Sequence, residues 1–221
     1  DFPIFLGSEI DQADPKQAMF HVLPVPYEKT VSYGGGTNKG PSTILNASWQ
    51  LEKWDGKSNP CDLGIYTCPP VDCSVSSQQV IDNIANATAE IIRNGGIPVV
   101  LGGEHTVTYG VIKGLKDAGI EDFGIVQIDA HAAFCEEEMQ VREEFGVYYQ
   151  DADELVPNNI NSITLPDDFP KKVFFTVDID GMDPSVFPST GTPVPGGLSW
   201  YQTLNLFESV AKQREIIGFD V

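Results

Sequence analysis

The stretch that most constrains the fold is Lys172 to Pro184, a short apolar run that ends in carboxylates. Residues 173–177 are β-branched or aromatic, which predicts a strand buried on both faces, as in a parallel sheet. Side chains alternate along a strand, so Asp178 and Asp180 should point to the same side. Two buried carboxylates repel each other and lose hydration. We therefore expect a divalent cation between them or, as the alternative, a solvated acidic turn.

Strand-like and helix-like segments alternate along the chain, which predicts one α/β domain over residues 1–221. Successive parallel strands need crossovers, so the expected sheet is mainly parallel, with helices on both faces and ligands beyond the carboxyl ends of its strands. Strands are expected at 18–27 (broken at Pro24 and Pro26), 62–67, 97–101, 123–128, 147–149, 173–177 and 216–219. Helices are expected at 40–54, from Ser77 as N-cap to Gly95, at 106–118 and 199–212, and, solvated, at 135–144. A loop is expected at 32–37 and an acidic turn at 151–154.

The composition excludes several classes of function. Thirty-two acidic and 13 basic residues give a net charge of −19, which opposes binding to nucleic acid or to an anionic membrane. No apolar run reaches the ~18 residues of a membrane span, and the N-terminus does not resemble a signal peptide. The four cysteines form no CxxC pair, so we expect reduced thiols in a cytoplasmic protein.

Metal-ligand residues follow three of the expected strands. His105 follows 97–101, Asp129 and His131 follow 123–128, and Asp178 and Asp180 follow 173–177. A lone histidine at a strand end is usually structural, but five such groups at equivalent ends predict a ligand site. Mixed imidazole and carboxylate ligands suit manganese, and two-metal hydrolytic centres share a carboxylate between their ions.

These motifs resemble those of the ureohydrolases, the family of arginase and agmatinase. The resemblance rests on GGEH at 102–105, DAH at 129–131, and TVDIDGMDP at 176–184 followed by STGTPVPGGL at 189–198. The segment VPYEKTVSYGGGTNKGPSTIL at 25–45 is more similar to agmatinase than to arginase. The resemblance spans nearly the whole chain.

The resemblance implies a three-layer α/β/α sandwich with two Mn²⁺ ions. One ion would be bound by His105, Asp129 and Asp178, and the other by Asp129, His131, Asp178 and Asp180. Asp129 and Asp180 would serve as the catalytic carboxylates. A metal-bridging hydroxide would attack the guanidinium carbon of a cationic substrate, expected to be agmatine, giving putrescine and urea. The resemblance also implies a homo-oligomer, a trimer or a hexamer.

Three departures from the family pattern favour an alternative. Ala133 stands where the Asp-x-His-x-Asp motif has its second aspartate, and a segment with a Ser-His-Ala type motif is absent between Phe134 and Cys135. Family members also continue past the equivalent of Val221 with a glutamate and a helix. Either the chain joins segments of a longer enzyme, or it is an inactive homologue that acts as a structural or binding subunit. A deacetylase of the related fold, which would use a single zinc, is a third alternative, disfavoured because the expected His-His pair is absent.

Overall fold

The computed structural model describes residues 2–131, 144 and 146–221, which form a six-stranded sheet whose hydrogen-bonded neighbours all run parallel. The strand order is β2-β1-β3-β6-β5-β4. The strands are β1 Phe20–Val25, β2 Ile65–Thr67, β3 Ile97–Gly102, β4 Gly124–Ile128, β5 Lys172–Val177 and β6 Glu215–Asp220. The parallel sheet that the alternation of strands and helices predicts is confirmed.

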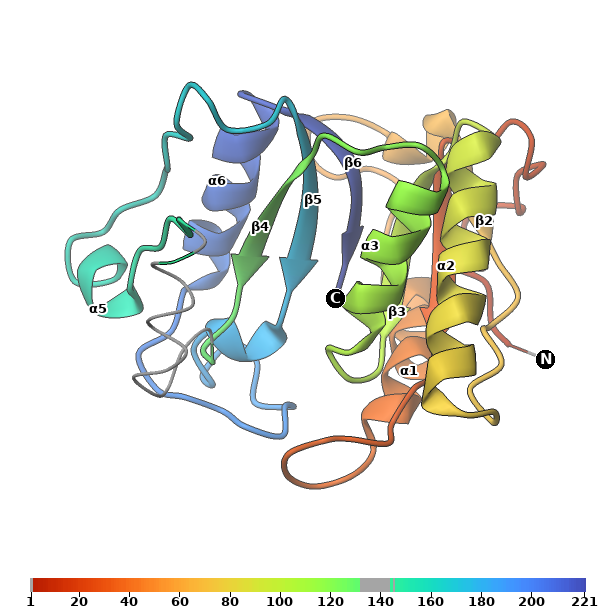
Figure 1. Cartoon of the computed structure of the whole chain (residues 1–221), viewed down its shortest axis with the longest axis horizontal. Helices are drawn as coiled ribbons and strands as arrows, with labels where there is room; N and C mark the ends of the chain where they lie inside the picture. Colours follow the sequence, from red (N-terminus) through yellow and green to blue (C-terminus); the bar gives the residue numbers. More distant parts are fainter. Residues whose placement is uncertain (1, 132–143, 145) are drawn as a thin grey trace.

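Helices lie on both faces of this sheet, which confirms the three-layer arrangement (Figure 1). The α2 and α3 helices cover one face, and α1 and α6 lie on the other. Their bounds, with the short α5, are α1 Gly40–Ala47, α2 Ser77–Arg93, α3 Val107–Asp117, α5 Ala152–Leu155 and α6 Trp200–Ala211. None of the described helices is long and apolar enough to cross a membrane.

Alternating side chains of the central strands build a separate core on each face. Phe174 of β5 packs in the cluster that contains the inner sides of α2 and α3, while Val173 and Phe175 pack against Val210 of α6. All four side chains are nearly inaccessible to solvent. The strand pattern predicted for 173–177 is therefore confirmed, and burial of both faces explains its unbroken apolar run.

The chain order places the carboxyl ends of four strands next to one another. After β3 the chain continues to β4, and it then returns through β5 and β6, so that β6 lies between β3 and β5. The residues that follow β3, β4 and β5 therefore meet at one edge of the sheet, where open parallel sheets bind ligands.

The first long helix is shorter than predicted. It ends at Ala47 and continues as a 3-10 turn, Ser48–Gln50, instead of reaching residue 54. The Ser48 hydroxyl donates to the carbonyl of Leu45 (2.6 Å) and accepts from the amide of Leu6 (2.8 Å). Such local bonds compete with the helical ladder. Leu45 is buried as expected, but Leu51 is 53% exposed.

Other expected elements also differ from the observed ones. Ser76, and not Ser77, caps α2 by accepting from the amide of Gln79. Pro24 does not break β1, which runs through Val25. Residues 147–149 are irregular instead of a strand, and the acidic turn at 151–154 lies in the α5 segment. The expected helix at 135–144 lies almost wholly outside the described residues.

One core-type strand is less buried than its sequence suggests. Ile125 of β4 is 42% exposed, although it pairs in register with the fully buried Phe174. In Figure 1, α2 and α3 lie over β1 and β3, while β4 forms the sheet's edge among the described residues. Among the described residues, no helix covers the face of β4 on the α2–α3 side.

Candidate metal centre

Three turns bring the predicted ligands together. His105 lies in the turn after β3, Asp129 and His131 in the turn after β4, and Asp178 and Asp180 at the end of β5. The structure gathers these five side chains into two groups whose ligand atoms lie within 4.8 Å of one another: His105, Asp129 and Asp178; and Asp129, His131 and Asp180.

The turn that carries His105 needs its glycines. A Cβ atom on Gly103 would lie 2.0 Å from the carbonyl oxygen of Tyr27, closer than any side chain can approach. The amide of Glu104 also donates to that carbonyl, at 3.0 Å. Close packing against the end of β1 thus explains the GGEH sequence and fixes where His105 leaves the sheet.

The first group centres on the Nδ1 atom of His105. This atom lies 3.3 Å from Oδ2 of Asp129 and 3.6 Å from Oδ2 of Asp178. Hydrogen bonding to Asp129, then to Asp178, raises the pKa of His105 to about 10 against desolvation by burial. Without an ion, a proton on His105 therefore takes the position of a positive charge between the two carboxylates.

The second group is more deeply set. Nδ1 of His131 lies 2.6 Å from Oδ2 of Asp180 and 3.9 Å from Oδ1 of Asp129. The Asp180 side chain is only 2% exposed. Burial raises its pKa, and the nearby negative charge of Asp178 adds to this rise. A divalent ion bound here would offset the repulsion between the two carboxylates and the cost of burying Asp180.

Asp129 belongs to both groups and is held from three directions. It accepts from the amide of His131 at 2.6 Å and from the side-chain amide of Gln127 at 2.7 Å. Burial tends to raise the pKa of Asp129, but hydrogen bonds from His105, from the His131 amide and from Gln127 lower it overall. Asp129 is therefore an ionised carboxylate with one oxygen facing each histidine.

The reason given above for the pairing of Asp178 and Asp180 is wrong, although both carboxylates do reach the site. The strand ends at Val177, and Asp178 caps a 3-10 turn, Ile179–Gly181, by accepting from the amide of Asp180 at 3.0 Å. The two carboxylates therefore enter different groups instead of sharing one strand face. The implied second role of Asp178, as a ligand of both ions, stays a prediction.

Several supporting residues are absent from the sequence-based predictions. Thr192 and the amide of Ala130 donate to Asp180, and Nε2 of His105 lies 2.8 Å from Oγ1 of Thr176. Asp220, at the end of β6, is 2% exposed and lies beside Thr176 in the sheet register. A carboxylate directly after an apolar strand was the signal that could have identified Asp220.

The glycine-rich loop at 32–37 is irregular up to Gly36, as predicted, and a 3-10 turn begins at Thr37. Two carboxylates hydrogen-bond to backbone amides in and just before this loop. Glu104 accepts from the amides of Lys29 and Thr30, both at 2.8 Å. Glu28 accepts from the amides of Gly36 and Asn38 at 2.6 and 3.1 Å. Glu104 immediately precedes His105, so its bonds tie residues 29–30, just before the loop, to the turn that carries His105.

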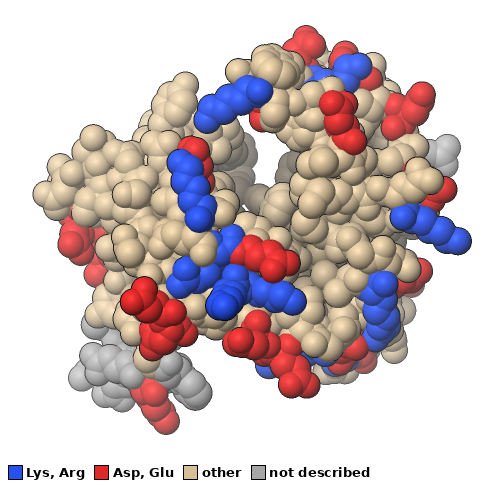
Figure 2. Space-filling view, turned by 90° about the horizontal axis from the view of Figure 1, so that it is seen from above, with Lys and Arg blue, Asp and Glu red and all other residues tan. Residues whose placement is uncertain are grey.

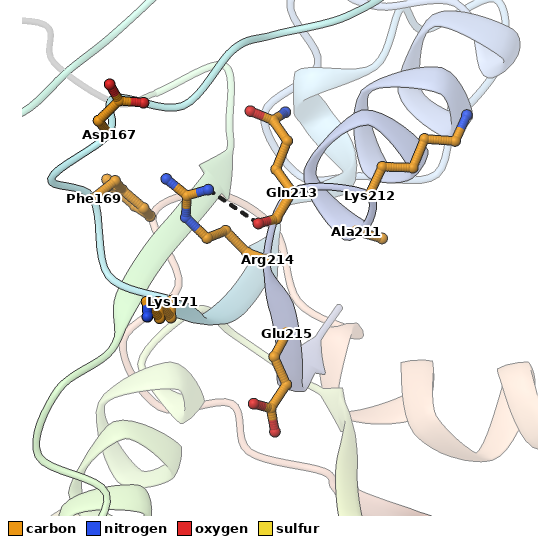
Figure 3. A pocket seen from close by; sticks show the side chains of 8 residues that line it. All are labelled: Asp167, Phe169, Lys171, Ala211, Lys212, Gln213, Arg214 and Glu215. Carbon is orange, nitrogen blue, oxygen red and sulfur yellow. Dashed lines mark hydrogen bonds between the residues drawn. The ribbon is translucent and has the colours of Figure 1, made fainter.

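A hollow of about 500 Å³ lies at the opposite end of the sheet, where β5 and β6 begin. Figure 2 views this end and shows Lys and Arg side chains gathered near its middle. The lining residues are Asp167, Phe169, Lys171, Ala211, Lys212, Gln213, Arg214 and Glu215 (Figure 3). Arg214 donates to the carbonyls of Pro166, Pro170 and Gln213, so its guanidinium is already committed to the backbone. None of the candidate metal ligands at the carboxyl ends of the strands lines this hollow.

Comparison with known proteins agrees with the sequence motifs. The family model described as Arginase family matches residues 18–161 and 133–221. The chain belongs to the arginase family. Within that family it is 35% identical, over 247 residues, to the N(1)-aminopropylagmatine ureohydrolase of Synechocystis sp., with 90% of this chain and 79% of that protein covered. It is 26% identical to the agmatinase of Pyrococcus horikoshii, covering 96% of this chain and 86% of that protein.

Solved structures show the same fold. Proclavaminate amidino hydrolase from Streptomyces clavuligerus superimposes with a TM-score of 0.80 at 22% identity, covering 100% of this chain and 87% of the other. An arginase from Medicago truncatula gives 0.78 at 19% identity, covering 93% and 79%. This arginase-family chain therefore has the arginase fold. Ala133 and the Phe134–Cys135 junction lie outside the described residues.

Proposed function

We propose that this chain hydrolyses a guanidino compound to urea and an amine, using two divalent metal ions, expected to be Mn²⁺. The observation that carries the proposal is the sharing of Asp129 between a group with His105 and a group with His131. Two adjacent sites with a common carboxylate are the arrangement that two-metal hydrolases use.

The donor set suits such ions. Each group combines one imidazole with two carboxylates, a mixture that suits manganese among the divalent metals. When bound, the ions would supply a water of lowered pKa and an electrophile that polarises the substrate.

The protein's own side chains would hold the centre in place. Asp129, which is 7% exposed, is fixed by the Gln127 side chain and the His131 amide, while Asp180 is held by Thr192 and the Ala130 amide. The chain's charge of −19 favours the approach of a cationic guanidino substrate.

Agmatine, giving putrescine and urea, is our first candidate substrate. Its support is the agmatinase-like segment at 25–45 and the similarity to proteins named agmatinase. N1-aminopropylagmatine is the second candidate, because the relatives at 35% and 30% identity from Synechocystis sp. and Thermus thermophilus carry that substrate in their names. Both molecules present a guanidinium group on an amine-bearing tail.

We also propose that relatives carry an additional internal segment where this chain passes from Phe134 to Cys135. The alignment with the Synechocystis protein is 247 residues long, whereas the whole chain has 221, so it must contain gaps in this chain. The two stretches matched by the family model overlap at 133–161, which supports a junction in this region. A homo-oligomeric, cytoplasmic protein remains part of the proposal; light scattering would measure the oligomeric state.

The deciding experiment measures urea released from agmatine, N1-aminopropylagmatine and arginine by the Mn²⁺-loaded chain. We expect urea from an amine-tailed substrate and none from the Asp129→Asn variant. The Ala133→Asp variant tests whether the missing motif carboxylate limits activity. Wild type and Ala133→Asp protein that both bind two ions yet release no urea would contradict the hydrolase and support the structural-subunit alternative.

A further inference from the structure

Asp220 is a buried carboxylate that the proposed reaction does not use directly. It ends β6, between β3 and β5, and is 2% exposed. One of its oxygens, Oδ2, has no hydrogen-bond partner among the described residues. Keeping an incompletely paired carboxylate in a protein interior is unfavourable, so such a group calls for an explanation.

The neighbours of Asp220 connect it to a predicted metal ligand. The sheet register pairs Asp220 with Thr176 of β5. Burial raises the pKa of Asp220, while hydrogen bonds from the Thr176 and Thr108 hydroxyls and the charge of His105 oppose that rise. The Thr176 hydroxyl lies 3.2 Å from that of Thr108 and 2.8 Å from Nε2 of His105. The hydroxyl of Thr176 therefore links Asp220 to the imidazole of His105.

The direction of these hydrogen bonds decides which imidazole nitrogen is free. Nδ1 of His105 faces Asp129 and Asp178, so this nitrogen must lose its proton to bind a cation. The remaining proton is then on Nε2, which donates to the Thr176 oxygen. Thr176 can accept that bond when its own hydrogen points elsewhere, and an ionised carboxylate, which only accepts, provides that direction.

We propose that Asp220 is a positioning residue that, through the hydroxyl of Thr176, holds His105 in the tautomer whose Nδ1 binds the first metal ion. Thr108 helps to orient the Thr176 hydroxyl. Without the carboxylate, Thr176 can turn and donate to Nε2, which places the proton on Nδ1, between Asp129 and Asp178. Partners that orient a metal-binding histidine in this way typically contribute 10–100-fold to affinity.

The test rests on the proposed metal centre and measures Mn²⁺ binding by calorimetry instead of catalysis. The Asp180→Asn background isolates the first site. In that background we expect Asp220→Asn and Thr176→Val each to weaken Mn²⁺ binding about 10–100-fold. Thr176→Ser should restore the affinity lost with valine. Combining Asp220→Asn with Thr176→Val should add little to the loss from Thr176→Val, because both act through one contact.

Two controls separate positioning from a general loss of structure. Thr88→Val removes a buried hydroxyl on α2 that likewise has no hydrogen-bond partner in the described part of the chain, and it should leave Mn²⁺ affinity unchanged. In a His105→Ala background, which retains the second group, Asp220→Asn should have no effect.

Each outcome has a distinct meaning. A wild type that binds no Mn²⁺ would contradict the metal centre and the positioning role together. Normal first-site affinity in the Asp220→Asn and Thr176→Val variants would overturn the positioning role alone. An equal loss from Asp220→Asn in the His105→Ala background would also overturn it. Should Asp220→Asn not fold, the comparison of Thr176→Val with Thr176→Ser decides the question.

Discussion

Nδ1 of His131 lies 2.6 Å from Oδ2 of Asp180, at the base of the second group of ligands. In the absence of an ion, this contact pairs two atoms that both face the position a cation would occupy. Metal binding must therefore replace an existing contact, and its strength should depend on pH and on each carboxylate separately.

The sharing of Asp129 predicts unequal effects for two similar substitutions. Asp129→Asn removes a ligand from both groups, whereas Asp180→Asn, its matched control, removes one from the second group only. We expect Asp129→Asn to abolish tight Mn²⁺ binding and Asp180→Asn to retain one ion. Equilibrium dialysis with metal analysis measures both. Two tight ions in Asp129→Asn protein would show that Asp129 is not the common ligand.

The raised pKa of His105 predicts that metal binding releases a proton. Hydrogen bonds to Asp129 and Asp178 raise this pKa to about 10, so the ion-free imidazole is protonated at neutral pH. A metal needs the neutral form, and apparent Mn²⁺ affinity should therefore rise about tenfold per pH unit between pH 7 and 9. Calorimetry in two buffers of different ionisation enthalpy counts the protons released. No release would contradict the proposed ligand role of His105.

The raised pKa of His105 also makes the stability of the ion-free protein depend on pH. Stability should fall as pH rises, whereas Mn²⁺ affinity should increase. A pKa raised above the unfolded value, near 6.5, stabilises the fold fully below pH ~6.5, and this contribution is lost as pH rises through about 10. We expect the ion-free melting temperature to fall from pH 7 to 10. His105→Ala protein should show a smaller fall, and an identical pH profile would exclude His105 as the cause.

Glu104 ties Lys29 and Thr30, just before the glycine-rich loop, to the turn that carries His105, and its loss should affect both stability and metal binding. Its carboxylate accepts from the Lys29 and Thr30 amides. Glu104→Gln should lower the free energy of unfolding by about 1.5–3 kcal/mol, the range for hydrogen bonds to charged groups, and weaken Mn²⁺ binding. The exposed Glu121→Gln is the matched control and should change stability by less than about 0.5 kcal/mol. Chemical denaturation and calorimetry measure the two effects.

The hollow at the start of β5 and β6 should be structural. Arg214 bridges three backbone carbonyls there, and lysine cannot reproduce its planar set of donors. We expect Arg214→Lys to destabilise the fold by about 1–3 kcal/mol and to leave Mn²⁺ affinity unchanged. Lys212→Ala, which removes an exposed pair with Glu208, should have little effect. A large rise in the KM for the guanidino substrate with either variant would instead place part of the substrate site in this hollow.

The convergence of the five candidate ligands could be predicted from the sequence, because all five follow strands whose carboxyl ends lie at the same edge of the sheet. Apolar runs followed by His105, Asp129 and Asp178 identify both the strands and their carboxyl ends. The convergence of five side chains follows from parallel strand direction. The separation of Asp178 from Asp180 could not be predicted in this way, because the strand ends one residue before Asp178 and a 3-10 turn follows.

Tertiary contacts explain the other differences. The helix at 40–47 stops early because Ser48 bonds to the distant amide of Leu6, a contact that local periodicity does not reveal. Asp220 carried the same strand-end signal as Asp129, but its closeness to His105 depends on β6 inserting between β3 and β5. Strand order is a property of the whole fold, and a single strand pattern does not encode it.

Anomalous X-ray scattering from crystals of the Mn²⁺-loaded protein would test the central claim most directly. We predict two manganese peaks, one bound by His105, Asp129 and Asp178 and the other by Asp129, His131 and Asp180, with Asp129 bound to both. Peaks elsewhere, or a fully loaded protein with no manganese at these side chains, would contradict the metal centre and the hydrolytic function that depends on it.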